Sequence, residues 1–107
     1  MAIFKIQTLN SIAVTGLDRF PRDRYEVASE VSKPDAILLR SFKMHDMTVA
    51  DSVLCVGRAG AGTNNIPVAK LSKRGIPVFN TPGANANAVR ELVIAGLLMA
   101  ARNLPQA

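Results

Sequence analysis

Three short apolar runs constrain the fold more than any other feature of this sequence. They are Ala36–Leu39, Val53–Val56 and Ile76–Phe79, and each is followed by a residue typical of a loop. Four apolar residues in a row, without the alternation of a half-exposed strand, are typical of strands buried on both faces of a parallel sheet. Because parallel strands need a crossover segment between them, the runs predict an α/β fold.

Weaker patterns before, between and after these runs supply the remaining elements. The predicted strands are Ile3–Leu9 and Tyr25–Ala28, and the predicted helices are Ile12–Phe20 (or a turn there), Pro67–Arg74 before a capping Gly75, and a last helix from Asn85 or Asn87 to Asn103. Together these elements predict a doubly wound parallel sheet of about five strands with right-handed crossovers. Ligands of such sheets bind beyond the carboxyl ends of the strands.

Length and composition fit one compact domain. The chain has 107 residues, 49% of them apolar, which is too apolar for a disordered segment and enough for one core. The single cysteine, Cys55, excludes an intrachain disulfide and a multi-cysteine zinc site. No secretory leader pattern opens the chain, and the longest apolar run, Leu92–Ala101, is shorter than the ~20 residues that cross a bilayer. We therefore expect a cytoplasmic protein without a membrane partner.

The charge favours an anionic partner. Thirteen Lys and Arg against eight Asp and Glu give a net charge of +5. The basic residues are scattered rather than clustered, and one tyrosine and four phenylalanines offer few platforms for base stacking. We therefore expect a small anion as the ligand and no nucleic acid, and steep salt dependence of DNA or RNA binding would favour the opposite.

Three loops come directly after predicted strands, which places all of them at the carboxyl edge of the sheet. They are Arg40–Lys43, Gly57–Gly62 and Asn80–Asn85. A solvated arginine or a plain tight turn is the ordinary explanation for any one of these loops. Three of them at one edge, two of which carry an arginine, instead favour a binding site.

The residue types in these loops suit a small acid. Arg40 and Arg58 supply planar guanidinium groups that can bind a carboxylate or phosphate through two hydrogen bonds. Gly60 and Gly62 let backbone N–H groups approach an anion closely. Asn85 lies near a helix start, where an amide and the partial positive charge of the helix terminus come together. The loops therefore predict a cationic pocket.

Other possible cofactor-binding, catalytic or metal sites are less well supported. The stretch Gly60–Gly62 follows a strand, but the third glycine of a dinucleotide fingerprint would stand where Asn65 is, and no acidic residue lies near position 80. His45, the only histidine, is expected at the surface. Cys55 lies inside an apolar strand, where it is expected to act as an inert small side chain. The sequence offers no convincing acid–base pair and no metal site.

The spacing of several motifs resembles a known family. From Ala36 onward, over about two thirds of the chain, the order and spacing of these motifs resemble those of NAD-dependent D-2-hydroxyacid dehydrogenases, in particular D-3-phosphoglycerate dehydrogenases. The segments that carry the resemblance are Gly57–Ile66, Lys73–Ile76, Asn80–Asn85, Glu91–Leu92 and Ala101–Ala107. The first 33 residues are similar only in their strand–helix–strand pattern.

This resemblance implies a flavodoxin-like fold and only part of an enzyme. Residues 1–107 correspond to the N-terminal portion of the substrate-binding domain, and the NAD-binding Rossmann domain is absent from the sequence. The family's catalytic and cofactor-binding residues lie in that missing domain. The implied reaction is oxidation of 3-phosphoglycerate to 3-phosphohydroxypyruvate in serine biosynthesis, and the chain alone is expected to be inactive. Two alternatives remain open: another D-2-hydroxyacid dehydrogenase, or a non-catalytic module that binds a small anion.

The resemblance also suggests substrate contacts, all in the three loops. These residues are Arg40, Ser41, Lys43, Arg58, Ala59, Gly60 and Asn85. The two arginines would contact the phosphate of a small phosphorylated hydroxy acid. The backbone of Ala59 and Gly60 would hold its carboxylate, Asn85 would line the cleft, and Ser41 and Lys43 would add contacts from the first loop.

The last helix predicts association. Its apolar residues, within Leu92–Ala101, cover nearly every direction around the axis. A helix that is apolar on all sides is normally buried on all sides. We expect one face to pack on the chain's own sheet, while another face needs cover from the missing domain or from a second copy. Without that domain, we expect the chain to self-associate as a homo-oligomer. The alternative is a helix buried on one side, with its small residues exposed on the other.

Overall fold

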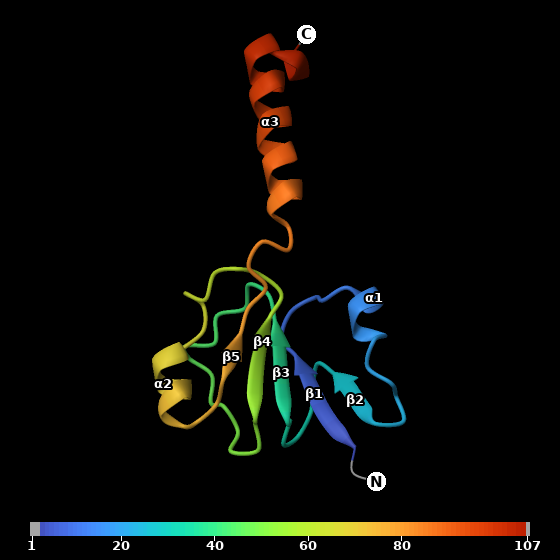
Figure 1. Ribbon diagram of the computed structural model, residues 1–107, viewed down its shortest axis with the longest axis vertical. Coiled ribbons are helices and arrows are strands. Elements are labelled where there is room, and N and C mark those ends of the chain that lie inside the picture. The colour runs from blue at the N-terminus through green and yellow to red at the C-terminus, as the bar shows by residue number, and fades with distance from the viewer. Residues whose placement is uncertain (1–2, 107) are drawn as a thin grey trace.

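The computed structural model describes residues 3–106 and contains one parallel five-stranded sheet (Figure 1). Its strands are β1 (Phe4–Thr8), β2 (Tyr25–Ala28), β3 (Ala36–Leu39), β4 (Cys55–Arg58) and β5 (Val78–Phe79). The strand order is β2-β1-β3-β4-β5, which is the order of flavodoxin-like sheets. The predicted α/β fold is therefore confirmed, although Met1, Ala2 and Ala107 lie outside the described residues.

The helices follow the expected order but differ in extent. They are α1 (Val14–Leu17), α2 (Val68–Lys73), α3 (Ala86–Arg102) and the 3-10 turn η1 (Leu104–Gln106). Gly75, with φ of 75°, follows the end of α2, as the predicted cap requires. The segment 40–54 contains turns and no helix, so the crossover between β3 and β4 is irregular.

The main core lies on one face of the sheet, and Ile6, which is in register with Ala36, is buried on the opposite face. Alternate strand residues such as Ile37 and Leu39 point to the face of the main core, and residues of α2 and of the segment 40–54 cover them. The buried cluster consists of Ile37, Leu39, Met44, Val49, Val53, Val56, Ile66, Leu71 and Ile76. The expectation that the central strands are buried on both faces is therefore wrong.

The opposite face of the sheet is open. Its exposed apolar side chains include Phe4, Leu54 and Phe79, and Leu38 and Cys55 are half-buried. A hollow of about 310 Å³ on this face is lined by Phe4, Ile6, Phe20, Tyr25, Asp35, Ala36, Leu38, Leu54 and Cys55. The apolar runs are continuous because both faces are apolar, but the described residues cover the second face only in part, where Ile6 is buried and Leu38 and Cys55 are half-buried.

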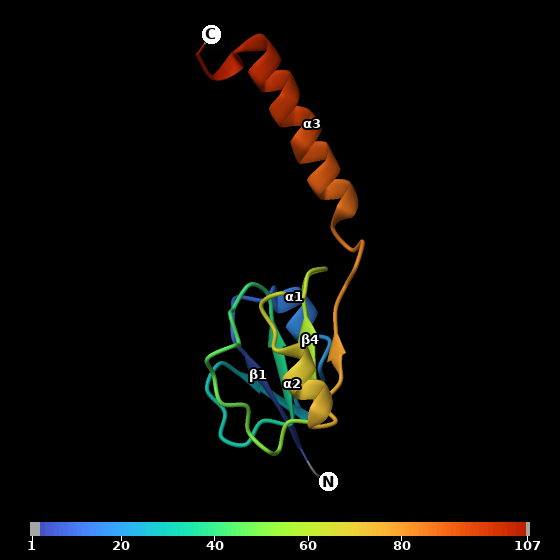
Figure 2. The same cartoon turned by 90° about the vertical axis from the view of Figure 1, so that its left-hand side faces the viewer.

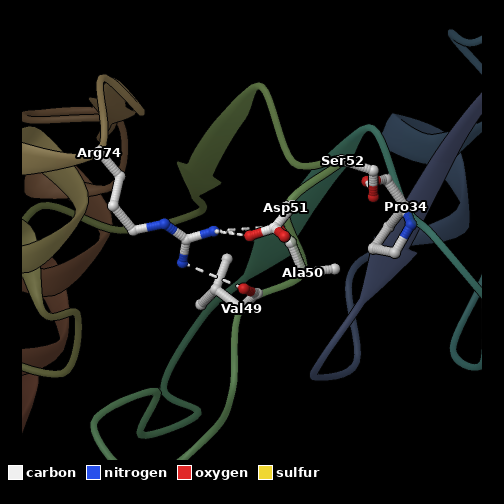
Figure 3. Close-up of polar contacts among 6 residues, drawn as sticks. All are labelled: Pro34, Val49, Ala50, Asp51, Ser52 and Arg74. Atoms are coloured by element: carbon white, nitrogen blue, oxygen red, sulfur yellow. Dashed lines mark hydrogen bonds and ion pairs between the residues drawn. The ribbon is translucent and has the colours of Figure 1, made fainter.

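Arg74, at the end of α2, fixes the irregular crossover to the body of the fold (Figure 3). Its guanidinium group donates to the carbonyl oxygens of Val49 at 3.0 Å and Ala50 at 3.3 Å, and it lies 3.4 Å from the carboxylate of Asp51. The Ser52 hydroxyl donates to the carbonyl oxygen of Pro34 at 2.7 Å. These contacts anchor the segment that leads into β4.

Helix α3 stands away from the sheet (Figures 1 and 2). The structure measures 59 × 32 × 21 Å, and no residue of α3 is buried. The expectation that one face of this helix packs on the chain's own sheet is wrong. The reason is the linker after β5, which is bonded back to the sheet edge at Thr81 and then turns at Gly83, with φ of 80°, so that the helix starts beyond that edge. No helix in residues 3–106 is long and apolar enough to cross a membrane.

Candidate functional site

The three loops that follow β3, β4 and β5 meet at the carboxyl edge of the sheet. Together they form a cleft of about 370 Å³, lined by Arg40, Ala59, Gly60, Thr81, Ala84 and Asn85. Four of these residues belong to the site predicted from the sequence, and Thr81 and Ala84 were not predicted. Parallel strands bring the loops together because all their carboxyl ends lie at the same edge.

Arg40 is the only charged residue that lines this cleft. It directly follows β3 at the centre of the sheet, and it is exposed. Among the described residues its side chain makes no hydrogen bond or ion pair with the protein. Its guanidinium group is therefore available to a ligand, and no carboxylate in the cleft competes for it.

Arg58 differs from Arg40 in that its side chain forms hydrogen bonds with the main chain. Its Nε donates to the carbonyl oxygen of Arg40 at 2.7 Å, and its Nη1 donates to the carbonyl oxygen of Gly62. It lines a neighbouring hollow of about 210 Å³ on the open side of the sheet, rather than the cleft of Arg40. The predicted pair of arginines is thus divided between two hollows, and Arg58 connects the first loop with the second.

The glycines of the second loop allow this contact. A Cβ atom at Gly60 would lie 3.0 Å from Arg58 Nε, and one at Gly62 would lie 3.0 Å from Arg58 Nη1. Both distances are shorter than ordinary van der Waals contact, so alanine at either position would push against the guanidinium group. The loop therefore wraps around Arg58, and the absence of side chains makes that close approach possible.

The hydrogen bonds of the second loop leave several donors free. The Ala59 N–H donates to the carbonyl oxygen of Leu39 at 2.8 Å, so it extends the sheet and is not available to a ligand. The N–H groups of Gly60, Ala61 and Gly62 make no hydrogen bond within residues 3–106. These N–H groups are therefore available to donate to an anion, and of the three residues Gly60 lines the cleft. Of the two predicted backbone contacts, Gly60 has a free donor and Ala59 does not.

Loop 2, defined as residues 57–62, is tied to the linker after β5. The Asn80 side-chain amide donates to the carbonyl oxygen of Ala61 at 2.7 Å, and the Thr81 N–H donates to that of Gly60 at 3.0 Å. Because these carbonyls are bound, the peptide groups of the loop are held in one orientation. The linker therefore supports the side of the cleft that carries the free N–H groups.

Asn85 lines the cleft at the start of α3. Its side chain makes no capping hydrogen bond to the helix, while its carbonyl oxygen accepts from the Val89 N–H at 3.0 Å. An amide with free donors at a helix N-terminus adds to the positive potential of the cleft. Ser41 and Lys43, by contrast, are exposed and do not line the cleft.

Two asparagines near the site were not predicted. Asn10, after β1, accepts hydrogen bonds from the N–H groups of Arg40 and Phe42 through its Oδ1. Asn65 is 8% exposed, and its Nδ2 donates to the carbonyl oxygens of the same two residues at 3.0 and 2.8 Å. The sequence indicated only that Asn65 interrupts a dinucleotide fingerprint, and it gave no sign of the role of Asn10.

The remaining candidates do not form a reactive centre. His45 is exposed, as expected, and its Nε2 lies 2.7 Å from the Asn64 carbonyl oxygen, to which it donates. Cys55 is half-buried in β4. No group of three or more His, Cys, Asp or Glu side chains within the described residues could hold a metal ion. The cleft is therefore suited to binding and orienting an anion.

Comparisons with known proteins agree with this fold. A model of the catalytic domain of D-isomer specific 2-hydroxyacid dehydrogenases matches residues 2–100. A D-3-phosphoglycerate dehydrogenase of Archaeoglobus fulgidus is 42% identical in an alignment 87 positions long that covers 78% of this chain and 16% of that protein. One of Haemophilus influenzae is 33% identical in an alignment 107 positions long that covers 95% of this chain and 26% of that protein.

A solved structure is also similar. It is the crystal structure of the NAD⁺-bound 3-phosphoglycerate dehydrogenase of Entamoeba histolytica, with a TM-score of 0.72 and 27% identity over 92% of this chain and 39% of that chain. The present chain thus spans between about a sixth and two fifths of the length of these relatives. It belongs to the D-isomer specific 2-hydroxyacid dehydrogenase family, whose catalytic domain matches residues 2–100.

Proposed function

We propose that this chain is the substrate-binding portion of an NAD-dependent D-3-phosphoglycerate dehydrogenase, which oxidises 3-phosphoglycerate to 3-phosphohydroxypyruvate in serine biosynthesis in the cytoplasm. The observation that carries the proposal is the cleft, where the free guanidinium group of Arg40 lies with the unbound N–H of Gly60 and with Asn85. The names of the similar proteins support the choice of substrate.

The chemistry of the cleft fits a substrate with two anionic groups. A guanidinium group can bind phosphate oxygens through two parallel hydrogen bonds, while free peptide N–H groups suit a carboxylate. In this proposal Arg40 binds the phosphate, and Gly60 with its neighbours binds the carboxylate. Binding at both ends orients the carbon that bears the hydroxyl group, and such orientation lowers the barrier of a reaction between bound partners.

The residues described here do not fit NAD. Loop 2 resembles the start of a dinucleotide fingerprint, but it wraps around the guanidinium group of Arg58 through Gly60 and Gly62. Asn65, where a third glycine would be needed, is buried and bound to the loop after β3. NAD accepts a hydride when bound, and we propose that another part of the enzyme holds it. The role of this chain is to bind the substrate, to orient it and to neutralise its charge.

The binding test compares two substitutions that each remove one positive charge from the same loop. Arg40→Ala should weaken binding of 3-phosphoglycerate about fivefold to tenfold, because one charge-assisted contact in a partly exposed cleft contributes about 1–1.5 kcal/mol. Lys43→Ala should change it less than about twofold, since Lys43 does not line the cleft. The measurement is an NMR titration that follows the amides of residues 60–62 and 85.

The same titration with D-glycerate, which lacks the phosphate, tests the choice of substrate. We expect wild-type protein to bind D-glycerate more weakly than 3-phosphoglycerate and Arg40→Ala to bind the two equally. Equal binding of both acids by the wild type would contradict the phosphate assignment and favour another D-2-hydroxyacid. No shift of these amides with either acid would contradict the proposed site itself.

The chain by itself should show no NAD-dependent oxidation of 3-phosphoglycerate or of any other 2-hydroxy acid. Such an oxidation needs a hydride acceptor and a group that takes the hydroxyl proton, and residues 3–106 hold no dinucleotide cradle and no acid–base pair in the cleft. The measurement is NADH absorbance with the purified 107-residue chain at high concentration. Turnover above the background would mean that the chain carries catalytic residues that the cleft does not reveal.

A further inference from the structure

The loop after β3 is held mainly by side chains rather than by a helix or a sheet. The N–H groups of Arg40 and Phe42 both donate to Asn10 Oδ1, the first at 3.1 Å. The carbonyl oxygens of the same two residues both accept from Asn65 Nδ2, at 3.0 and 2.8 Å. Two amide side chains therefore satisfy all four main-chain polar groups of Arg40 and Phe42.

The two asparagines reach this loop from both sides. Asn10 follows β1 and Asn65 belongs to the loop after β4, and β1 and β4 are the two neighbours of β3 in the sheet. Both are themselves anchored near the loop by main-chain hydrogen bonds. The Leu9 N–H, next to Asn10, donates to the carbonyl oxygen of Leu38 at 3.0 Å, and the carbonyl oxygen of Asn65 accepts from the Met44 N–H at 2.8 Å.

The requirements on the two positions differ. Asn10 needs only an acceptor, because its Oδ1 makes both contacts to the loop. Asn65 needs two donors on one nitrogen, because its Nδ2 faces two carbonyl oxygens. Asn65 is also buried, so its loss would leave polar groups without partners inside the protein. Asn10 is half-buried and is therefore the safer position for a test.

The consequence concerns Arg40. Its main chain is fixed at both the N–H and the carbonyl oxygen, while its side chain makes no hydrogen bond or ion pair among residues 3–106 and lines the cleft. A charged group on a fixed backbone binds a ligand better than the same group on a mobile loop, because less conformational freedom is lost on binding. Arg58 contributes to the same anchoring through its bond to the Arg40 carbonyl oxygen.

We propose that Asn10 and Asn65 are positioning residues that hold Arg40 at the cleft for an anionic substrate. The proposal rests on the proposed function of the cleft, in which Arg40 binds the phosphate. It assigns to two neutral side chains outside the cleft an effect on the affinity for the anion that is exerted through Arg40.

The test uses three variants of the 107-residue chain and three measurements. Asn10→Ala removes the acceptor, Asn10→Asp keeps it, and Asn64→Ala is the matched control, because the side chain of Asn64 makes no hydrogen bond within the described residues. NMR gives the rates at which the amides of Arg40 and Phe42 exchange with water. A titration gives the affinity for 3-phosphoglycerate, and thermal unfolding gives Tm.

In Asn10→Ala the amides of Arg40 and Phe42 should exchange at least about tenfold faster, while those of β3 and β4 stay as slow as in the wild type. The affinity for 3-phosphoglycerate should fall about fivefold, since a mobile Arg40 loses more freedom on binding. Asn10→Asp should retain the slow exchange of both loop amides, because a carboxylate accepts the same two hydrogen bonds. Asn64→Ala should match the wild type in all three measurements.

Three results would overturn the proposal. The first is unchanged affinity in Asn10→Ala together with faster exchange at Arg40 and Phe42, which would show that order in the loop does not matter for binding. The second is unchanged exchange at these amides. The third is faster exchange throughout β3 and β4 with a lower Tm, which would show a role in global stability alone. If the wild type itself binds no 3-phosphoglycerate, the proposed function fails and the positioning role of the asparagines fails with it. If the wild type binds 3-phosphoglycerate, the three results above test the positioning role by itself.

Discussion

Leu98→Glu should convert a self-associating chain into a monomer. Helix α3 exposes apolar side chains along its whole length, with Leu92 74%, Leu97 66% and Leu98 61% exposed. A contiguous apolar surface of this kind drives association, and two such helices can cover each other. We therefore propose that the chain forms a homo-oligomer through α3. A glutamate in the paired surface would lose its hydration if the helices stayed together. Burial of an unpaired carboxylate costs more free energy than separation of the helices, so the helices should separate.

The measurement is light scattering or sedimentation over a concentration series. Leu54→Glu is the matched control, because Leu54 is exposed to a similar extent, 63%, but lies on the open face of the sheet. We expect Leu54→Glu to associate as the wild type does. Dissociation by Leu54→Glu instead of Leu98→Glu would place the contact on the sheet, and a wild-type chain that is monomeric at every concentration would refute association altogether.

Leu39→Ala should remove much of the free energy of unfolding of this chain. Leu39 is fully buried in β3 and packs in the one-sided core. Removal of a buried leucine side chain costs about 2–5 kcal/mol, whereas whole domains are stable by about 5–15 kcal/mol. A sheet with one open face buries less apolar surface than one covered on both faces, so we expect the wild-type chain to lie at the lower end of that range.

Urea denaturation monitored by circular dichroism gives the free energy of unfolding. The Leu98→Glu background keeps association from adding to the apparent stability. Leu54→Ala is the control, since it makes the same chemical change at a side chain that is 63% exposed, and it should cost less than about 1 kcal/mol. Equal losses at the two positions would mean that the core does not lie on the face described here.

Local sequence patterns predicted the sheet well. The bounds of β2 and β3 agree with the expected ones, because each strand coincides with a short apolar or alternating run. Strand β4 begins two residues later than expected, at Cys55. The Val53 N–H closes a local turn onto the Ala50 carbonyl oxygen, and the Leu54 N–H makes a tertiary contact, because it donates to the carbonyl oxygen of Asp35. Such contacts between distant segments leave no trace in a run of apolar letters.

The site was predicted in outline and not in its division of roles. The edge of the sheet follows from the order of the strands, so the loops with Arg40, Gly60 and Asn85 could be expected to meet. The direction of an arginine side chain cannot be predicted in this way. Arg58 turns toward two carbonyl oxygens, and Asn10 reaches across to the loop of Arg40, because of distances that arise only after folding.

The position of α3 shows a similar limit. Its apolar character predicted burial, but the sequence does not say against what, and residues 3–106 leave the helix without cover. The linker geometry at Thr81 and Gly83 decides where the helix goes, and the hydrogen bonds that set it come from loop 2. Periodicity thus predicts which surfaces need a partner, while the partner depends on the rest of the assembly.

The wrapping of loop 2 around Arg58 has a consequence for how this sequence can change. Gly60 and Gly62 have no side chains because the guanidinium group fills the space that a Cβ atom would need. If a shorter residue replaced Arg58, that space would become available and alanine at either glycine would no longer meet an obstacle. If Arg58 stays, a Cβ atom at either position requires the guanidinium group to move by a few tenths of an ångström. Substitutions at the three positions are therefore expected to be coupled, and the cost of an alanine at either glycine should depend on whether Arg58 is still present.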